Sequence, residues 1–234
     1  MTKPRSDATE REKMVTLVIA TTHRGKHVEF RDLLAGLPVE VFGLTEVLTK
    51  PLTIVEDGAT FRENAMKKAL IVARATGMLT LADDSGLEVD ALGGRPGVRS
   101  ARFAGERATD AENNATLLAA LTDVPDAART ARFRCALVLA DPFAPKADAP
   151  TVCEATCEGT LCREARGTAG FGYDPLFLVQ GTGRTMAELN DREKNAISHR
   201  AAAVRQLIPV LDGVLRRYAE TAARLDPGVD VPQS

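Results

Sequence analysis

Two adjacent carboxylates, Asp83 and Asp84, are followed by the hydroxyl of Ser85 and by Gly86. The two acids directly follow the short apolar run 78–82. We therefore expect them at the end of a strand, with Ser85 and Gly86 turning the backbone. Acids and a hydroxyl in a glycine-rich crevice can hold hydrated Mg²⁺, which takes few protein carboxylates and completes its shell with water and phosphate. A charged turn is the competing interpretation, because Asp, Ser and Gly are common turn residues.

The polar segment TTHRGK is a candidate phosphate site. It lies between a predicted buried strand over 14–20 and a predicted amphipathic helix, and it contains Thr21, Thr22, His23, Arg24, Gly25 and Lys26. A loop between a strand and a helix aims backbone N–H groups at an anion, and Arg24 and Lys26 add positive charge. The segment is not a Walker A motif, because it lacks the leading glycine and the Ser or Thr after Lys26. Taken alone, it is a solvated helix start.

Glu56 is a candidate metal ligand in a polar loop. It precedes a helix that Thr60 and Glu63 open as a capping box. Glu63 is therefore assigned to the helix cap, whereas no structural task is evident for Glu56.

A glycine-rich loop over 167–175 and the segment 193–200 add aromatic and basic groups. The loop contains Phe171, Gly172, Tyr173 and Asp174, and the later segment contains Lys194, His199 and Arg200. Aromatic rings can face a base and lysines can neutralise phosphate, so together with the acids these residues are typical of a nucleoside triphosphate site. Taken singly, the rings indicate core, Lys194 a solvated charge and His199 a helix start.

The elements that would position these residues alternate between strands and helices. Besides the strand with the two acids, strands are predicted over 14–20, 39–42, 130–140, 151–161 and 177–179. Helices are predicted after the first strand, over 60–75, after residue 109 and at the end of the chain. This order predicts an α/β fold with a mixed central sheet flanked by helices, which binds ligands in a crevice at the strand ends.

Length and composition indicate a globular chain that can bury a sizeable core. Of 234 residues, 44% are hydrophobic, and 30 Lys plus Arg stand against 32 Asp plus Glu, for a net charge of −2. This balance gives no electrostatic reason to expect a nucleic acid or a membrane as partner. No apolar run is long enough to span a membrane, and we find no hydrophobic signal core at the N-terminus.

We expect one domain over residues 14–222, with flexible tails at 1–13 and 226–234, because the ends are polar and show no periodicity. The four cysteines form no CxxC pair, so we expect them to pack as small apolar residues instead of binding zinc or forming disulfides. Reduced cysteines favour a cytoplasmic location.

Five segments together resemble the inosine triphosphatase (Ham1-like) family of non-canonical purine nucleoside triphosphate pyrophosphatases. They are TTHRGK at 21–26, EDGATFRENA at 56–65, ADDSGLEVDALGGRPGVRSARFAG at 82–105, GTAGFGYDPLF at 167–177 and EKNAISHR at 193–200. The resemblance implies an elongated α/β fold of two lobes with an active-site cleft between them, Mg²⁺ dependence and a homodimer. It also implies hydrolysis of ITP, dITP and XTP to the monophosphate and pyrophosphate, which cleanses the nucleotide pool.

The resemblance also implies a role for each candidate residue. Asp84 would be the proton acceptor and a metal ligand, Glu56 the second metal ligand, and Asp83 a supporting catalytic acid. Residues 21–26 and Lys194 would hold phosphates; the nucleoside would contact Ser85, residues 171–174, His199 and Arg200. The family usually has Asn where this chain has His23, and a neutral imidazole is bulkier but can still donate one hydrogen bond.

Two other functions fit parts of the pattern. A house-cleaning pyrophosphatase for modified pyrimidine nucleotides would need different base contacts and no His199–Arg200 pair. A non-catalytic nucleotide-binding or RNA-binding module would have no use for Glu56, Asp83 and Asp84, because unpaired acids repel a triphosphate unless a metal lies between them. RNA binding would also require a basic stripe with interleaved aromatics, which this sequence lacks. Which acid is the base stays open, since coupled carboxylates share their titration.

Overall fold

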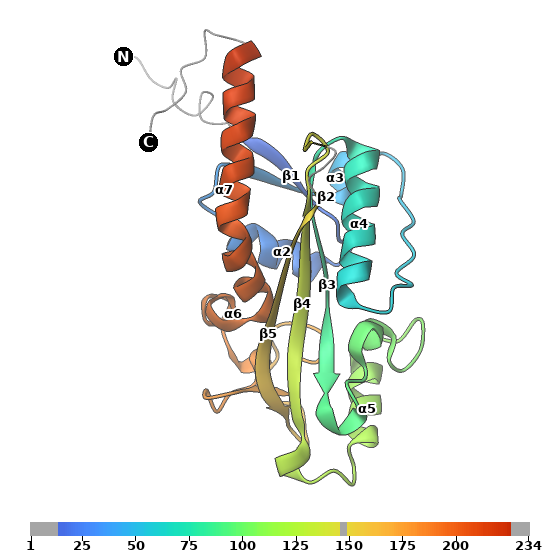
Figure 1. Cartoon of the computed structure of the whole chain (residues 1–234). Coiled ribbons are helices and arrows are strands. Elements are labelled where there is room, and N and C mark those ends of the chain that lie inside the picture. Colours follow the sequence, from blue (N-terminus) through green and yellow to red (C-terminus); the bar gives the residue numbers. More distant parts are fainter. Residues whose placement is uncertain (1–13, 146–148, 226–234) are drawn as a thin grey trace, which may run out of the picture.

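The computed structural model describes residues 14–145 and 149–225, which form an elongated molecule around one six-stranded sheet (Figure 1). The tails predicted over 1–13 and 226–234 lie outside the described residues. The strand order is β2-β1-β3-β4-β5-β6. The first three strands are parallel, and β4, β5 and β6 each run antiparallel to the strand before them. The predicted α/β fold with a mixed sheet flanked by helices is therefore confirmed.

The elements follow the predicted alternation. The first half of the chain contains β1 (Val15–Ile19), α2 (Arg24–Leu33), β2 (Val39–Gly43), α3 (Leu44–Val47), α4 (Phe61–Thr76) and β3 (Leu79–Val89). The second half contains α5 (Asp110–Ala120), β4 (Thr130–Ala140), β5 (Thr151–Leu161), β6 (Phe177–Val179), α6 (Asp191–Ile197) and α7 (His199–Leu225). A 3₁₀ helix, η2 (Gly97–Arg102), lies between β3 and α5. Among the helices in the described ranges, none is long and apolar enough to cross a membrane.

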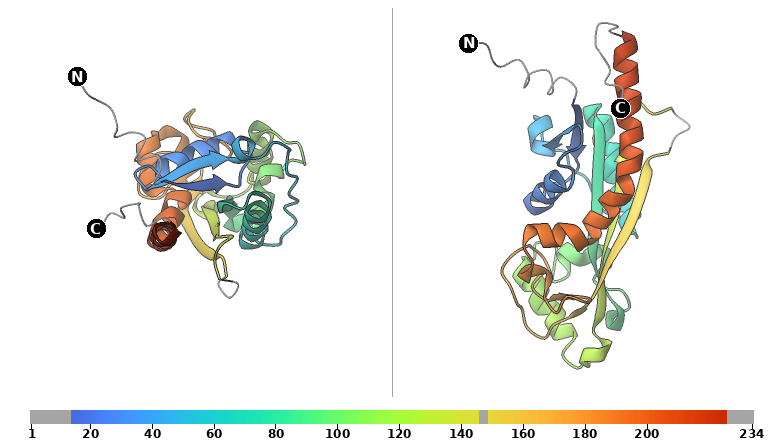
Figure 2. Two further views of the ribbon diagram at one scale, coloured as in Figure 1. Left: turned by 90° about the horizontal axis from the view of Figure 1, so that it is seen from above. Right: turned by 90° about the vertical axis from the view of Figure 1, so that its left-hand side faces the viewer.

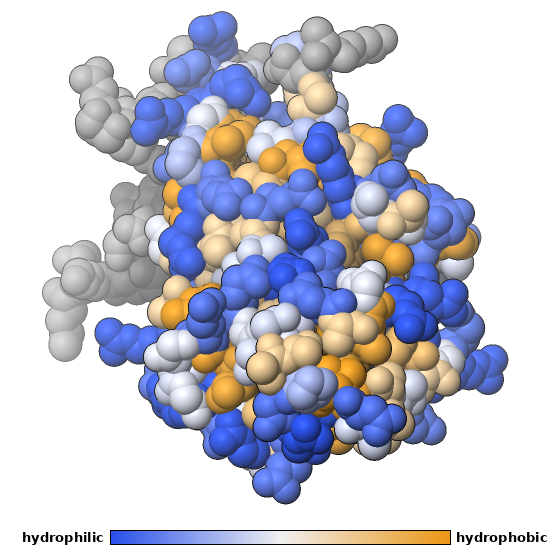
Figure 3. Space-filling view, turned by 60° about the horizontal axis from the view of Figure 1, so that its bottom comes forward, coloured by the Kyte–Doolittle hydropathy of each residue, from blue (hydrophilic) through white to orange (hydrophobic). Residues whose placement is uncertain are grey.

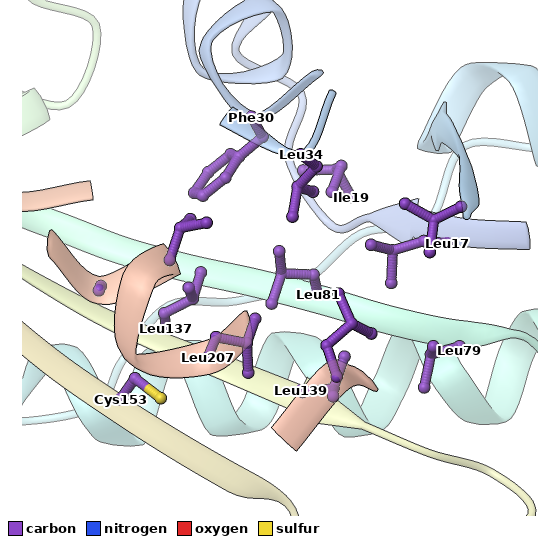
Figure 4. Packing of buried hydrophobic residues seen from close by; sticks show 14 of the residues in the cluster. Leu17, Ile19, Phe30, Leu34, Leu79, Leu81, Leu137, Leu139, Cys153 and Leu207 are labelled. Carbon is purple, nitrogen blue, oxygen red and sulfur yellow. The ribbon is translucent and has the colours of Figure 1, made fainter. Parts of the chain in front are cut away.

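Helices cover both faces of the upper part of the sheet (Figures 1 and 2). On one face, α2 and α7 bury leucines and Phe30 against β1, β3 and β4, as the close view of Leu17, Leu81, Leu137 and Leu207 shows (Figure 4). On the other face, α4 packs its alanines and Val72 against the same strands. Burial of these apolar side chains from water is the main force that fixes both helix layers on the sheet.

The three long strands connect two lobes. β3, β4 and β5 have 11 residues each, whereas β1 has five, so the long strands continue beyond β1 into the lower lobe. There α5, β6 and the loop before β6 bury a separate apolar cluster, which includes Leu87, Leu117, Phe133, Leu161 and Phe177. Hydrophilic residues dominate the surface of this end, with apolar residues showing between them (Figure 3).

The prediction that Ser85 and Gly86 turn the backbone is wrong. Residues 80–89 of β3 all pair antiparallel with β4, so the strand continues straight through both acids. β1 accompanies β3 only as far as Leu81. The acids therefore lie in the middle of a strand, not at its end, and only Ala82 separates them from the last residue that β1 pairs. A paired neighbour, not the local sequence, determines that this turn-like segment is extended.

Gly86 provides the first test of this packing. A Cβ built at Gly86 would lie 2.7 Å from the Gly97 carbonyl oxygen and 2.9 Å from the Phe61 ring. Gly86→Ala should therefore lower the free energy of unfolding by about 1–3 kcal/mol through overpacking, measured by urea denaturation.

The matched control is Gly213→Ala in α7, where a Cβ would meet no atom of the described chain within 4 Å. Alanine is the better helix former, so this variant should be neutral or more stable by about 0.5–1 kcal/mol. A Gly86→Ala protein as stable as the wild type would contradict the close approach of η2 to β3.

Candidate active site

A cavity of about 380 Å³ between the two lobes gathers most of the predicted residues. Its volume lies in the range of small-ligand pockets. The predicted residues that line it are Thr21, Thr22, His23, Lys26, Glu56, Asp84, Ser85, Phe171, Gly172, Tyr173, Asp174, His199 and Arg200. Four predicted residues of the described chain are not part of the lining: Arg24, Gly25, Asp83 and Lys194.

Asp83 is buried beside the cavity and binds two cations of the chain. Lys26 Nζ donates to Asp83 Oδ2 at 2.8 Å, Ser85 Oγ donates to the same oxygen at 2.9 Å, and Arg200 Nε lies 3.6 Å from it. Burial alone raises the pKa of Asp83, but the charges of Lys26 and Arg200 outweigh it and hold the pKa well below its ordinary value. Asp83 is therefore a fixed anion that orients Lys26 and Arg200.

Asp84 points to the opposite face of the sheet, because successive side chains of a strand alternate. Asn64 Nδ2 donates to Asp84 Oδ2 at 2.9 Å, and Lys68 Nζ lies 3.9 Å from Oδ1. Burial raises the pKa of Asp84, and the attraction of Lys68 and the bond from Asn64 offset this only in part. A carboxylate with a raised pKa is a stronger base than an exposed one, so Asp84 is better suited than Asp83 to accept a proton.

Glu56 also has a partner in the chain. Lys68 Nζ donates to Glu56 Oε2 at 2.7 Å, and Arg102 Nη2 donates to the Glu56 carbonyl oxygen at 3.1 Å. The prediction that Glu56, Asp83 and Asp84 are unpaired is therefore wrong. Burial lowers the pKa of Lys68, but the surrounding carboxylates raise it above its ordinary value, so Lys68 is a cation at neutral pH.

Asn64 and Lys68 are site residues that sequence reasoning missed. Both lie within the apolar stripe of α4, which Phe61, Ala65, Ala69 and Val72 define. A polar residue on the buried face of an amphipathic helix must find a polar partner, because an unpaired buried polar group costs several kcal/mol in an apolar medium. The sequence did contain a signal for them: Asn64 and Lys68 are two polar residues, four positions apart, within a stripe that is otherwise apolar.

Glu56 and Asp84 could hold a divalent cation together. Both carboxylates face the cavity, and one ammonium group, Lys68 Nζ, lies near both. Within the described residues, no group of three or more His, Cys, Asp and Glu side chains could hold a metal ion. Two carboxylates are nevertheless the donor set that Mg²⁺ uses when substrate phosphates and water complete its shell.

Arg200 and His199 begin α7 and are buried at the cavity. Arg200 donates from Nη1 to Glu29 at 2.9 Å and from Nη2 to Ser85 Oγ at 3.0 Å. The His199 ring stacks on Phe133 with 5.0 Å between centroids, and neither ring nitrogen has a hydrogen-bond partner in the described chain. Burial, reinforced by nearby cations, holds the pKa of His199 well below its ordinary value. A neutral His199 thus offers one donor and one acceptor.

Phe171 brings the glycine-rich loop into contact with the candidate phosphate loop, residues 21–26. Its ring lies 4.4 Å from the His23 ring between centroids, and Lys194 Nζ lies 4.9 Å from its centroid. Lys194 also donates to Asp174 Oδ2 at 2.7 Å. The ammonium group of Lys194 therefore lies over the Phe171 ring and is paired with Asp174. His23 caps α2, where its Nδ1 accepts the Lys26 N–H at 3.3 Å.

Comparison with known proteins identifies the family. The sequence pattern of the Ham1 family matches residues 17–210. The chain belongs to the Ham1 family. A protein of Syntrophobacter fumaroxidans named dITP/XTP pyrophosphatase is 52% identical over 207 residues, which cover 88% of this chain and 86% of that protein. A protein of the same name from Geobacillus kaustophilus is 52% identical over 194 residues, or 83% of this chain and 93% of the relative.

Solved structures support the same relationship. The structure of a HAM1 protein from Coxiella burnetii is similar to this Ham1-family chain with a TM-score of 0.76 and 44% identity. The match covers 86% of this chain and 100% of that one. The resemblance noted in the five sequence segments is therefore confirmed at the level of the family and the fold.

The depressed pKa of His199 predicts a pH-dependent stability. The unfolded chain binds a proton at His199 near its ordinary pKa of 6.5, whereas the folded chain does not. The unfolded state thus binds more protons below that pH, and the free energy of unfolding should fall with decreasing pH by up to about 1.4 kcal/mol per unit from this group.

His199→Gln removes the titrating ring, so its free energy of unfolding should fall less steeply between about pH 7.5 and 5.5. Urea denaturation at several pH values measures both slopes. The slopes are compared, not the absolute stabilities, because the variant also loses the packing on Phe133. Equal slopes would contradict a buried, neutral His199.

Proposed function

We propose that this Ham1-family protein hydrolyses the non-canonical purine nucleoside triphosphates ITP, dITP and XTP to the monophosphate and pyrophosphate. The observation that carries the proposal is the position of Asp84. This carboxylate with a raised pKa faces a cavity that Lys26 of the segment 21–26 and residues 171–174 of the glycine-rich loop also line. The names of the relatives, dITP/XTP pyrophosphatase, support the same substrates.

The triphosphate would lie between the N-terminus of α2 and the cations Lys26 and Lys68, which both line the cavity. Free N–H groups at a helix start and the positive end of the helix dipole favour a phosphate. Lys26 is held from behind by Asp83, so its ammonium group is positioned before substrate binds. Lys194, predicted to hold phosphate, would act here by supporting Phe171 and Asp174.

Glu56 and Asp84 would hold Mg²⁺ together with the substrate phosphates. When bound, the ion would supply positive charge that neutralises the triphosphate and polarises its phosphorus–oxygen bonds. The ammonium group of Lys68 would then attract the substrate phosphates as well as these two carboxylates.

Asp84 would act as the proton acceptor. The oxygen of an attacking water forms a bond to the α-phosphorus, the bond from that phosphorus to the bridging oxygen breaks, and pyrophosphate leaves. The proton of the water passes to Asp84, whose Oδ2 is held by Asn64. Positioning and charge neutralisation supply most of the catalysis in such phosphoryl transfers.

The base would lie near Phe171, His199 and Arg200. The N–H groups of Phe171 and Gly172 already donate to Asp174 and Asp110, so they are not free for a purine. Arg200 directs Nε toward Asp83 and donates from its other nitrogens to Glu29 and Ser85. The remaining donor is a ring N–H of His199, whose nitrogens have no hydrogen-bond partner among the described residues. This donor suits the 6-keto oxygen of hypoxanthine and xanthine, and Arg200 would add positive charge beside it.

We also propose a cytoplasmic location and a homodimer. All four cysteines are free thiols and three of them are buried, which supports a reducing, cytoplasmic location. A homodimer stays a prediction that size-exclusion chromatography with light scattering would check.

A substrate screen tests the proposal. The purified protein is assayed on ITP, dITP, XTP, GTP, ATP and modified pyrimidine triphosphates, with and without Mg²⁺, and pyrophosphate is scored separately from orthophosphate. Pyrophosphate from ITP, dITP and XTP, only with Mg²⁺, is the expected result. IDP as the main product would contradict it, a preference for modified pyrimidines would favour the pyrimidine alternative, and binding without turnover would favour a binding module.

Asp84→Asn should abolish turnover while nucleotide binding survives. The amide keeps the shape of the side chain but removes the base, which should lower kcat by about a hundredfold or more. Stopped assays measure kcat, and isothermal titration calorimetry measures the Kd of ITP. Activity within a few-fold of the wild type would refute the role of Asp84.

Base selectivity should follow the order ITP and XTP above GTP, and GTP above ATP, in kcat/KM. A site built on hydrogen bonds can reject an analogue without the right partner by roughly four to five decades. Adenine presents a 6-amino donor to the N–H donor of His199 and to the positive charge of Arg200, whereas guanine keeps the 6-keto group and differs at the 2-amino group. Comparable kcat/KM values for ATP and ITP would contradict this base pocket.

A further inference from the structure

Helix α5 contacts the glycine-rich loop through two side chains to which no role has yet been given. Asp110 Oδ2 accepts the Gly172 N–H at 2.7 Å, and Asn114 Nδ2 donates to the Gly172 carbonyl oxygen at 2.9 Å. Residues four positions apart lie on the same face of a helix, so both side chains reach one residue of the loop. Both backbone polar groups of Gly172 are thereby fixed to α5.

Gly172 adjoins the aromatic ring that faces the phosphate loop. Its φ of +62° is a left-handed conformation that glycine adopts readily, and it lies between Phe171 and Tyr173. The Phe171 ring contacts the His23 ring at 4.4 Å and lies 5.1 Å from Arg200 Cζ. Fixing Gly172 therefore fixes the direction in which Phe171 points across the cleft.

The two contacts are not explained by the stability of α5 alone. Thr109 and Glu112 already form a capping box at its start. Asn114 Oδ1 is buried without a hydrogen-bond partner in the described chain, so the bond to Gly172 is the one hydrogen bond of this amide there. Asp110 could still stabilise the helix through the dipole at its first turn. A test must separate that charge effect from the acceptor effect.

We propose that Asp110 and Asn114 are positioning residues, which hold the loop at Gly172 so that Phe171 presents its ring to the purine base. The proposal rests on the proposed function of this cavity. Asp110 acts as a hydrogen-bond acceptor and Asn114 as a hydrogen-bond donor, and neither needs a charge to do so. The ring orientation, and with it the discrimination between purines, depends on the two bonds.

Three variants separate the possible effects: Asp110→Ala, Asp110→Asn and Asn114→Ala. An asparagine at 110 keeps an acceptor oxygen for the Gly172 N–H but loses the charge that would interact with the helix dipole. Asp123→Ala, an exposed carboxylate in the turn after α5, is the matched control. For each protein, kcat/KM is measured for ITP and ATP with Mg²⁺, with the Kd of ITP by calorimetry and the melting temperature.

Asp110→Ala and Asn114→Ala should each lower kcat/KM for ITP by about tenfold or more, since a small misplacement of a binding group lowers rates strongly. They should also reduce the ratio of kcat/KM for ITP over ATP. The kcat/KM of Asp110→Asn for ITP should stay within about threefold of the wild type. A variant with both alanines should lose less kcat/KM than the product of the two single losses, because both bonds fix the same residue.

Three results would overturn the proposal. They are alanine variants within twofold of the wild type, Asp110→Asn as impaired as Asp110→Ala, and losses that follow the melting temperature with an unchanged ITP-to-ATP ratio. If the wild type releases no pyrophosphate, the proposed function fails, and the Kd of ITP still tests the positioning role. If Asp110→Ala does not fold, Asn114→Ala and Asp110→Asn remain as tests.

Discussion

The alternation of side chains along β3 is the constraint on which the site depends. Asp83 and Asp84 are adjacent, but a strand points them to opposite faces of the sheet. One face is covered by α2 and α7, which supply Lys26 and Arg200, and the other by α4, which supplies Asn64 and Lys68. Two neighbouring carboxylates thus acquire opposite pKa shifts, lowered for Asp83 and raised for Asp84, and this difference is what suits them to the separate roles proposed for them.

Burial makes the pairing of these charges necessary. A buried ion is costly unless it is paired and hydrogen-bonded, and removing one partner of a buried pair leaves the other uncompensated. Asp83 binds Lys26 of α2 and lies close to Arg200 of α7, and Arg200 continues to Glu29 of α2. The same contacts that position Lys26 also hold two helices against one face of the sheet. Fold and site therefore share their interactions on this face.

The sequence predicted the elements better than the partners. Apolar runs and capping residues placed β4, β5 and α4 almost to the residue, and the capping box at Thr109 placed the start of α5, because these signals are local. The course of β3 through Asp84 and Gly86 was not predictable in this way, since the residues are typical of a turn and pairing with β4 overrides them. The pairing of Glu56 with Lys68 joins a loop to a helix face, and a single sequence does not contain that geometry.

The position of the cavity follows from unequal strand lengths. β1 ends at Ile19, opposite Leu81, and β3 continues for eight more residues into the second lobe. The segment 21–26 that follows β1 therefore begins beside the acids, so this segment and the two carboxylates meet without any turn in β3. At this point Lys68 lies near both Glu56 and Asp84, so within this group of three residues the carboxylates outnumber the cation by one, while Lys26 and Arg200 bring positive charge to the same cavity. A divalent cation held by the two carboxylates would remove their repulsion of a phosphate, so the proposed substrate and the proposed metal depend on each other.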